Sequence, residues 1–237
     1  MTGFFVSVNQ TGVERMTENN LAGLLLAWYE QHGRELPWRV KGGAHPDPYV
    51  ILVSELMLQQ TTVKTVIPYF HRFMKRFPTV KDLAEATQEE VYFYWQGLGY
   101  YTRARSLHAT ARLVMEKFNG RFPEKREDVL KLKGIGPYTV ASFLALAFNQ
   151  PETVVDGNVI RVISRLFRLT EPVSEILPQI REKAAGLTAR TRPADYASAI
   201  MDLGAMICTP KNPQCLLCPW QEHCLSKTDP GLEEIPR

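Results

Sequence analysis

Several features that would assign this sequence to a membrane protein or a secreted protein are missing. No apolar run approaches the roughly 18 residues that a membrane-spanning helix needs. The N-terminal segment from Met1 to Arg15 has no basic stretch followed by a long apolar one, so it does not resemble a secretory signal. We therefore expect no membrane span and a cytoplasmic location.

The sequence also lacks a strong charge of either sign. Lys and Arg number 28 against 25 Asp and Glu, which gives a formal net charge of +3. This balance is compatible with nucleic-acid binding but is too weak to argue for it. Hydrophobic residues make up 45% and charged residues 22%, as in ordinary globular proteins, so the chain suits one large domain or two small ones.

Cysteine is scarce, and its distribution is informative. The chain has 4 cysteines, spaced C-x6-C-x2-C-x5-C at Cys208, Cys215, Cys218 and Cys224. Four thiols this close can surround one metal centre. Structural zinc sites usually join two short cysteine pairs across a long gap, so a single C-x2-C pair favours a [4Fe–4S] cluster. Zinc remains the alternative, and a disulfide is disfavoured because a chain of this length can bury a core without one.

Alternating strand patterns are nearly absent, and apolar residues recur with a helical period along most of the chain. Leu21, Leu24, Leu25 and Trp28 form one apolar stripe on a first helix. Further helices are predicted at about 49–60, 63–76, 88–96, 102–118, 137–148, 157–168, 176–188 and 194–207. We predict an all-α protein, with residues 1–15 and the tail after Cys224 loosely ordered.

A glycine-rich turn interrupts this pattern between Leu132 and Tyr138. Gly134 and Gly136 tolerate tight turns, and Pro137 suits the first turn of a helix. Backbone N–H groups exposed at such a helix start attract phosphate. The stretch has the LxGxG form of a helix–hairpin–helix, a sequence-independent clamp on the DNA backbone. A plain helical joint with glycine caps is the alternative, and the adjacent Lys133 adds little to either interpretation.

Glu55 is a candidate general acid because it lies within an apolar helical segment. Ile51, Leu52 and Leu58 share its helix face. Burial among such neighbours raises the pKa of a carboxyl, and a carboxyl that stays protonated near neutral pH can donate a proton. The alternative is a Glu that reaches solvent at the end of its helix or pairs with an Arg.

Asp156 is a second candidate carboxylate. It follows the apolar pair Val154 and Val155 and precedes a helical stripe that begins at Val159. Asp is a favoured N-cap residue, so capping alone would explain it. A capping Asp can also present an ionised carboxylate to a cleft, and the two roles are compatible. Sequence spacing does not show whether Glu55 and Asp156 meet.

Taken together, these motifs resemble the endonuclease III superfamily of helix–hairpin–helix DNA glycosylases, and within it the MutY family of adenine glycosylases. The glycine turn, the later Asp and the four cysteines carry the first resemblance. The second rests on further motifs, which are Leu36-Pro37-Trp38-Arg39, Ser54 to Thr61, Gly97 to Arg105, Val155 to Val159 and Met201 to Cys208. The match runs from about residue 20 to residue 225.

The resemblance implies two helical modules with DNA lying across the cleft between them. A six-helix module at 36–150 carries the hairpin. The second module combines 16–35 with 151–225 and the [4Fe–4S] cluster, with Cys208, Cys215, Cys218 and Cys224 as ligands, and 226–237 forms a tail. The target nucleotide is flipped into the cleft.

The resemblance also implies a mechanism. Cleavage of an N-glycosidic bond passes through an oxocarbenium-like state, with Glu55 protonating the departing base and Asp156 stabilising the cationic sugar. Tyr138 stands where bifunctional relatives carry a Schiff-base lysine, and a phenol cannot form that imine. We therefore expect a monofunctional hydrolase, with Tyr138 and Asn158 assisting near the sugar.

The remaining family positions predict contacts with DNA and with the flipped base. Gln60 and Tyr100 match residues that wedge into the duplex, although Gln60 could be a surface amide and Tyr100 a core residue. The predicted contacts with the duplex are Gln60, Thr61, Tyr100, Lys133, Gly134 and Gly136, and the predicted base pocket is Trp38, Arg39 and Ser198.

Two departures from the MutY pattern bear on the substrate. MutY proteins usually carry a Gln or Glu that reads the adenine edge where this chain has Ser198, whose single hydroxyl cannot make a bidentate contact. Typical MutY proteins also continue into a domain that recognises 8-oxoguanine, whereas this chain ends at Arg237. It is therefore either truncated or reads the opposing base with the core alone.

The favoured substrate is a mispaired adenine opposite 8-oxoguanine or G in double-stranded DNA, acted on by a monomer in the nucleoid. A thymine or uracil glycosylase acting opposite G is the alternative within the same class. From other classes, a non-catalytic DNA-binding iron–sulfur protein and an iron–sulfur electron carrier remain open. Retention of both Glu55 and Asp156 argues against the non-catalytic protein.

Overall fold

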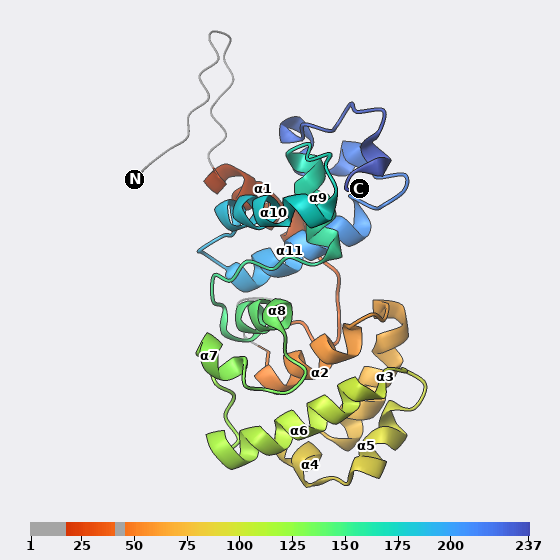
Figure 1. The fold of residues 1–237 in the computed structure, drawn as a ribbon, viewed down its shortest axis with the longest axis vertical. Helices are drawn as coiled ribbons and strands as arrows, with labels where there is room; N and C mark the ends of the chain where they lie inside the picture. The colour runs from red at the N-terminus through yellow and green to blue at the C-terminus, as the bar shows by residue number, and fades with distance from the viewer. Residues whose placement is uncertain (1–17, 41–45) are drawn as a thin grey trace.

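The computed structural model describes residues 18–40 and 46–237, and in these ranges every regular element is a helix (Figure 1). The α-helices are α1 (Glu18–His32), α2 (Pro48–Leu58), α3 (Val63–Arg76), α4 (Val80–Glu85), α5 (Gln88–Trp95), α6 (Tyr101–Phe118), α7 (Arg126–Val129), α8 (Pro137–Phe148), α9 (Gly157–Leu166), α10 (Val173–Leu187) and α11 (Pro193–Met206). Short 3₁₀ helices follow at η1 (Cys215–Leu217), η2 (Gln221–His223) and η3 (Leu232–Glu234). The all-α prediction is confirmed, and segment 1–15 lies outside the described residues.

A first hydrophobic core is built from the segment between α2 and α8. Leu52, Phe73, Trp95 and Phe143 are fully buried in it. Threonines begin three of its helices by accepting a hydrogen bond from a backbone N–H in the first turn, namely Thr62 for α3, Thr79 for α4 and Thr87 for α5. The central helices α2 and α8 are apolar on nearly every face, and they pack against each other through this core.

A second core brings the start of the chain next to its end. It contains buried residues of α1, α9, α10 and α11 together with Trp220. The Trp220 indole Nε1 donates a hydrogen bond to the carbonyl oxygen of Leu21 at 2.8 Å. Leu21, Leu25 and Trp28 are buried as the apolar stripe predicts, but Leu24 is 37% exposed. The buried face of α1 also includes Ala22 and Leu26, so it is turned away from Leu24 relative to the stripe that the sequence pattern suggested.

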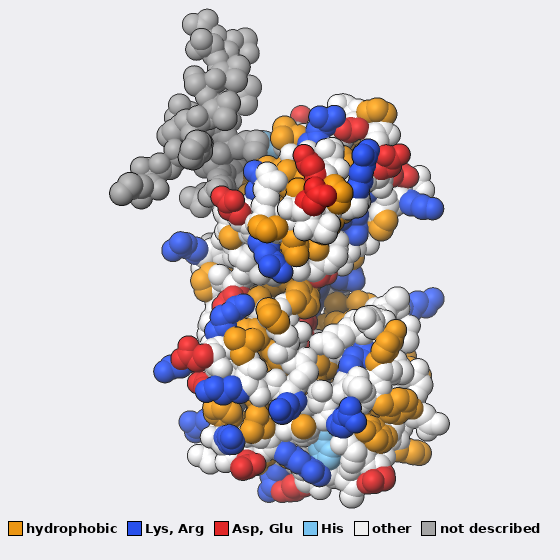
Figure 2. Space-filling model, in the orientation of Figure 1, with side chains coloured by type: hydrophobic (Ala, Val, Ile, Leu, Met, Phe, Trp, Pro, Cys, Tyr) orange, Lys and Arg blue, Asp and Glu red, His pale blue; other side chains and the backbone are white. Residues whose placement is uncertain are grey.

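Helix α11 joins the two cores and forms one wall of the space between them. Its Ala197 is buried in the first core, whereas Tyr196 and Ala199 belong to the second. In Figure 1, α11 lies above α8 at the waist of the molecule, and Figure 2 shows the surface hollowed at this waist. Within the described ranges, no helix has both the length and the apolar character that crossing a membrane requires.

The segment after Cys224 is packed against the second core, contrary to the expectation of a loose tail. Ile235 is 4% exposed, and its carbonyl oxygen accepts a hydrogen bond from Arg165 Nε at 2.8 Å. The backbone N–H of Val173, at the start of α10, donates to the carbonyl oxygen of Arg237 at 2.9 Å. The prediction was wrong because these partners lie more than sixty residues earlier, where a local pattern gives no sign of them.

Candidate active site

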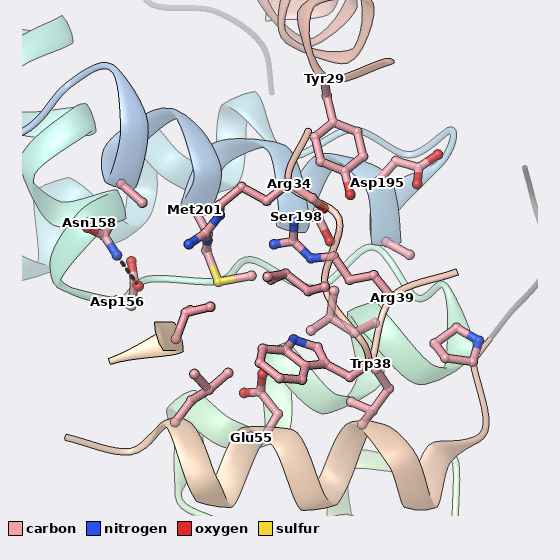
Figure 3. Close-up of a pocket in the computed structure, with 18 of the residues that line it drawn as sticks. Tyr29, Arg34, Trp38, Arg39, Glu55, Asp156, Asn158, Asp195, Ser198 and Met201 are labelled. Carbon is pink, nitrogen blue, oxygen red and sulfur yellow. Dashed lines mark hydrogen bonds between the residues drawn. The ribbon is translucent and has the colours of Figure 1, made fainter. Parts of the chain in front are cut away.

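The space between the two cores is a cleft of about 780 Å³. Figure 3 shows its lining side chains pointing inward from α2 below and from α9 and α11 above. Of the residues that the sequence marked for function, the cleft brings together Trp38, Arg39, Glu55, Thr61, Tyr138, Asp156, Asn158 and Ser198. The two candidate carboxylates, which lie a hundred residues apart in sequence, therefore share one cavity.

The surroundings of Glu55 bring the pKa of its carboxyl close to neutral pH. It is 9% exposed in the middle of α2, between residues that are fully buried. Burial raises the pKa of its carboxyl, and the negative charge of Asp156 raises it further. A nearby Ser142 hydroxyl and the Arg39 guanidinium oppose this, and the resulting pKa is about 7. Glu55 can thus both hold a proton and release it at physiological pH.

Asp156 is fixed by its position at the start of α9. Its Oδ1 accepts a hydrogen bond from the Val159 N–H at 2.7 Å, which caps the helix. Its Oδ2 accepts from the Asn158 amide at 3.1 Å (dashed in Figure 3). Both predicted roles of Asp156 are thus compatible in the structure, because a capping carboxylate also faces the cleft.

Tyr138 lies beside both carboxylates. Burial raises the pKa of its phenol, and the charges of Glu55 and Asp156 raise it further, so the phenol stays neutral. Its hydroxyl lies 4.0 Å from the sulfur of Met201, across the cleft on α11. The side chain is 37% exposed. Tyr138 can therefore contact a molecule in the cleft as a neutral hydrogen-bonding group but not as a general base.

Ser142 stands one helical turn after Tyr138 and was not singled out in the sequence. Its hydroxyl is fully buried and has no partner in strict hydrogen-bond geometry among the described residues. It is nevertheless close enough to lower the pKa of both Glu55 and Tyr138 by hydrogen bonding to their charged forms. The Ser142 hydroxyl can therefore donate a hydrogen bond to the ionised carboxyl of Glu55.

The opposite wall of the cleft is organised by Asp202, which is fully buried on α11. Arg39 donates to both of its carboxylate oxygens, at 2.7 and 2.9 Å, and Arg34 approaches it through Nε at 2.7 Å and its backbone N–H at 2.9 Å. Burial tends to raise the pKa of Asp202, but the two guanidinium groups outweigh it and hold this pKa below its usual value. This network fixes residues 34–39 against α11.

The predicted base pocket lies next to this network. Trp38 is 4% exposed and packs edge-on against Phe70, with ring centroids 5.2 Å apart. Ser198 is 5% exposed and lines the cleft from α11, near Trp38 and Arg39 (Figure 3). Tyr29, Arg34, Asp195 and Met201 also line the cleft, and the sequence reasoning assigned them no role. Of these, Met201 belongs to the family motif Met201 to Cys208, and Arg34 lies two residues before the motif that begins at Leu36.

The glycine turn has the geometry of an anion-binding hairpin between α7 and α8. Gly134 has φ +77, and a Cβ on it would lie 2.6 Å from Ser106 Cβ, so glycine is required there. Gly136 has ordinary extended backbone and open space, so it has no such requirement. Among the described residues, the N–H groups of Gly134, Ile135 and Gly136 have no protein acceptor. They remain available to an anion outside the cleft.

Gln60 and Tyr100 do not line the cleft, but their loops meet beside it. Both have left-handed backbone, with φ 57 at Gln60 and φ 47 at Tyr100. Tyr100 is 58% exposed, so it is not the core residue that the alternative interpretation would make it. Gln59 and Thr61, on either side of Gln60, do line the cleft.

The four cysteines lie together beside the second core, and none forms a disulfide. Cys208, Cys218 and Cys224 pack against the core, and burial raises the pKa of Cys218 to about 12, with the other three thiols adding to this effect. Nη1 of the buried Arg165 lies 3.7 Å from Cys208 Sγ and supplies positive charge near the thiols. A centre held by four thiolates beside a buried cation fits this arrangement.

The comparisons with known proteins agree with this arrangement. Residues 53–185 match the model of the HhH-GPD superfamily base excision DNA repair protein, and residues 208–224 match the iron–sulfur binding domain of endonuclease III. The second match contains all four cysteines, so the predicted iron–sulfur cofactor of the [4Fe–4S] type is confirmed over zinc and over a disulfide.

Two curated relatives and one solved structure illustrate the likeness. The chain is 38% identical to an adenine DNA glycosylase of Buchnera aphidicola subsp. Baizongia pistaciae, covering 89% of this chain and 59% of that protein. It is 45% identical to the adenine DNA glycosylase of Rattus norvegicus, covering 84% of this chain and 40% of that protein. A thermostable thymine-DNA glycosylase superposes with a TM-score of 0.78 at 29% identity, covering 89% and 96% of the two chains.

The chain thus spans about three fifths and two fifths of the two curated relatives. The superfamily match covers more than half of it, from the middle of α2 into α10. This matched region contains the buried acid, the capping aspartate and the hairpin that the structure assembles around and beside one cleft. The chain belongs to the HhH-GPD superfamily of base excision DNA repair proteins.

Proposed function

We propose that this chain is a monofunctional DNA glycosylase that removes a mispaired adenine, opposite 8-oxoguanine or G, from double-stranded DNA. The observation that carries the proposal is the pair of carboxyl groups in one cleft, with Glu55 at a pKa of about 7 beside Asp156. Two carboxyl groups with different environments are what acid-assisted cleavage of a glycosidic bond requires. Adenine is favoured because the curated relatives described above are adenine DNA glycosylases.

The proposed reaction begins with proton donation by Glu55 to a ring nitrogen of the flipped base. The bond between that base and C1′ of the sugar then breaks, and its electron pair leaves with the base. Asp156 stabilises the positive charge that develops on the sugar. A water molecule adds to C1′, and its proton returns to the Glu55 carboxylate. Tyr138 and Asn158 border the same space and orient the sugar.

The proposed DNA contacts surround this cleft. The unpaired N–H groups of Gly134 and Gly136 bind a backbone phosphate, with Lys133 beside them. Gln60, Thr61 and Tyr100 contact the duplex where the base leaves it. The [4Fe–4S] cluster, held by Cys208, Cys215, Cys218 and Cys224, supplies a cross-link that orders the segment 208–224. A monomer acting in the cytoplasm, at the nucleoid, remains a prediction.

A thymine glycosylase is the second candidate, and Ser198 favours it. The buried Ser198 lines the predicted base pocket and presents only one hydroxyl. Loss of a bidentate reader typically costs about 1–3 kcal/mol of base discrimination. The structural neighbour described above is itself a thymine-DNA glycosylase. The two candidates share Glu55, Asp156 and the cluster, and they differ only in the base that enters the pocket.

One substrate panel separates these candidates. Duplexes that carry A opposite 8-oxoguanine, A opposite G, T opposite G and U opposite G are each scored for abasic sites under single-turnover conditions. We expect release of A and little release of T or U. Release of T without release of A would contradict the adenine assignment and leave the glycosylase assignment intact.

One variant and one trapping reaction test the chemistry. Glu55→Gln keeps the shape of the side chain but cannot donate the proton, so base release is lost while duplex binding persists. A duplex-binding variant with normal turnover would remove Glu55 from the mechanism.

Borohydride should trap no covalent DNA adduct, because Tyr138 cannot form an imine. Efficient trapping would show a lyase activity instead. Duplex binding without base release by the unmodified chain on every substrate would favour the non-catalytic alternative.

A further inference from the structure

We propose that the buried guanidinium of Arg103 couples loop 59–61 to loop 97–100, so that Gln60 and Tyr100 enter the duplex as one rigid wedge. This inference rests on the proposed function, because it concerns how the flipped base is expelled. Arg103 does not line the cleft and touches no reacting atom, so it is a positioning residue.

Each of the two terminal nitrogens of Arg103 contacts one of the two loops. Nη1 donates to the carbonyl oxygens of Met57 at 2.8 Å and of Gln59, and to Thr61 Oγ1 at 3.2 Å. Nη2 donates to the carbonyl oxygens of Leu98 at 3.1 Å and Gly99 at 3.3 Å. A planar guanidinium presents its donors in a fixed fork. The orientation of one loop therefore sets the orientation of the other.

The burial of Arg103 makes these bonds obligatory. The residue is 6% exposed, and burial lowers the pKa of its guanidinium. Among the described residues no carboxylate pairs with it, so its charge is compensated by the loop carbonyls and by aromatic rings. Leaving a buried cation without such partners is expensive. Either loop can move only by breaking contacts of a buried charge.

Both coupled loops hold a non-glycine residue in left-handed backbone. The φ values of 57 at Gln60 and 47 at Tyr100 are unfavourable for residues that carry a Cβ, so surrounding contacts must hold them. The Tyr100 ring lies over the Arg103 guanidinium, with 5.2 Å between Cζ and the ring centroid, and the Trp95 ring centroid lies 5.6 Å from the same atom. The strained conformation is thus maintained by contacts that converge on Arg103. An exposed aromatic ring held in this way is suited to stack on a base.

The same framework reaches the hairpin. The side-chain amide of Gln59 donates to Thr139 Oγ1 at 3.3 Å and to the Gly134 carbonyl oxygen at 3.5 Å. The phosphate-binding turn and the two wedge loops are therefore parts of one hydrogen-bonded unit. Its internal spacing is fixed before DNA arrives, so no binding energy is spent on assembling the wedge.

A double-mutant cycle tests the coupling without disturbing the core. Gln60→Ala and Tyr100→Ala, alone and together, are placed in the unmodified chain and in the Arg103→Lys variant, whose single ammonium cannot serve both loops. The readout is the single-turnover rate of base release, from a normal mismatched duplex and from one whose target base is bulged. Arg112→Lys is the matched control, because Arg112 also lies on α6 and donates to backbone carbonyls, those of Ala84 and Ala86 at the C-terminal end of α4.

We expect the two alanine substitutions to be non-additive by about tenfold in the unmodified chain and additive within about twofold in Arg103→Lys. Arg103→Lys should slow release from the mismatched duplex at least tenfold and release from the bulged duplex less than threefold, because a bulged base is already unstacked. Additivity in the unmodified chain, or equal slowing on both duplexes, would overturn the proposal.

Two further measurements keep the test decisive. If Arg103→Lys does not fold, Thr61→Val removes one acceptor of the same Nη1 and should reduce the non-additivity; unchanged non-additivity would overturn the proposal. The fluorescence of 2-aminopurine beside the target base, recorded in the Glu55→Gln background, measures base flipping without cleavage. A coupled fluorescence response in this background, together with no base release by the unmodified chain from any duplex, would uphold the role of Arg103 and refute the proposed function.

Discussion

Glu55 shows how one residue can serve the proposed chemistry at the expense of folding. Its pKa rises from 4.5 in an unfolded chain to about 7 in the folded protein. Between these values the folded state holds a proton that the unfolded state has released, so stability falls as the pH rises from 4.5 to 7. The shift corresponds to roughly 3 kcal/mol, taken as an order of magnitude.

We therefore predict that Glu55→Gln stabilises the protein in a pH-dependent way. Gln resembles the protonated acid and carries no charge, so the variant and the unmodified chain should unfold with similar free energies near pH 4.5. At pH 8 the variant should be more stable, by an amount on the order of the pKa shift. Urea unfolding at both pH values measures this difference. A gain that is equal at pH 4.5 and pH 8 would show that Glu55 is not desolvated.

Ser142 acts on the same carboxyl, and its removal should change the pH dependence of base release. Its hydroxyl favours the ionised form of Glu55, so Ser142→Ala should raise the pKa of Glu55 above about 7. In the pH profile of the single-turnover rate, the alkaline limb, where the rate falls as Glu55 loses its proton, should move up by about one pH unit. A hydrogen bond to a charged group contributes about 1.5–3 kcal/mol.

Ser164→Ala is the control for this prediction. Ser164 is also fully buried with an unpartnered hydroxyl, but it lies in α9 within the second core. Its removal should leave the alkaline limb in place. The role of Ser142 would be refuted if both variants shift the limb equally or if neither does.

At the scale of the elements, the position of Asp156 depends on how closely α9 approaches α11. A Cβ added at Gly204 on α11 would lie 2.6 Å from Asn158 Cβ and 3.1 Å from the Asn158 backbone. Arg161 fixes the same contact by donating to Asn158 Oδ1 at 2.9 Å and to the Gly204 carbonyl oxygen. The start of α9, which carries both Asp156 and Asn158, therefore has no room to move closer to α11.

Gly204→Ala should therefore lower both stability and activity. The added methyl group displaces the first turn of α9, which typically costs about 1–3 kcal/mol for overpacking, and it moves Asp156 away from the sugar. Thermal unfolding and single-turnover base release measure the two effects. Gly23→Ala on α1 is the matched control, because its Cβ meets nothing within 4 Å. The control should leave base release unchanged, and a Gly204→Ala variant that behaves like it would contradict the close-packing argument.

The sequence predicted the long elements well, because helical periodicity and Thr or Asp caps are local signals. The short helices α4 and α7 were missed, since 6 and 4 residues are too few to show a period. The site was predicted only in part. Glu55 and Asp156 could be singled out by their neighbours, but their meeting depends on how α2 and α9 pack. Ser142 and Arg103 gave no local signal, because their partners are brought to them by tertiary structure.

On the scale of the whole molecule, the iron–sulfur segment, residues 208–224, holds the helices of the second core together. Within it, Trp220 bonds to Leu21 of α1, and the Leu225 N–H just after it donates to the Leu166 carbonyl oxygen at the end of α9. Arg165 adds bonds to the carbonyl oxygens of Thr209, at 2.6 Å, and Pro210, at 3.0 Å. The first core has no comparable dependence on residues 208–224.

Loss of the cluster should accordingly loosen one core more than the other. After oxidative removal of iron and chelation, we predict faster hydrogen exchange in α1, α9, α10 and α11 and little change in the segment from α2 to α8. Hydrogen exchange read by mass spectrometry resolves the two sets of helices. A uniform loss of protection, or none, would show that the cluster does not act through the second core.

The hydrogen bond between Trp220 and Leu21 joins residues 199 positions apart, and this separation has a consequence for synthesis on the ribosome. Helix α1 emerges before the other described helices, yet its apolar face finds its partners only when α9 to α11 and Trp220 have been made. The segment from α2 to α8 contains nearly all of its own core and can fold in the meantime. The nascent chain therefore carries an uncovered apolar helix until Trp220 has been made, which makes α1 a natural site for a chaperone to bind.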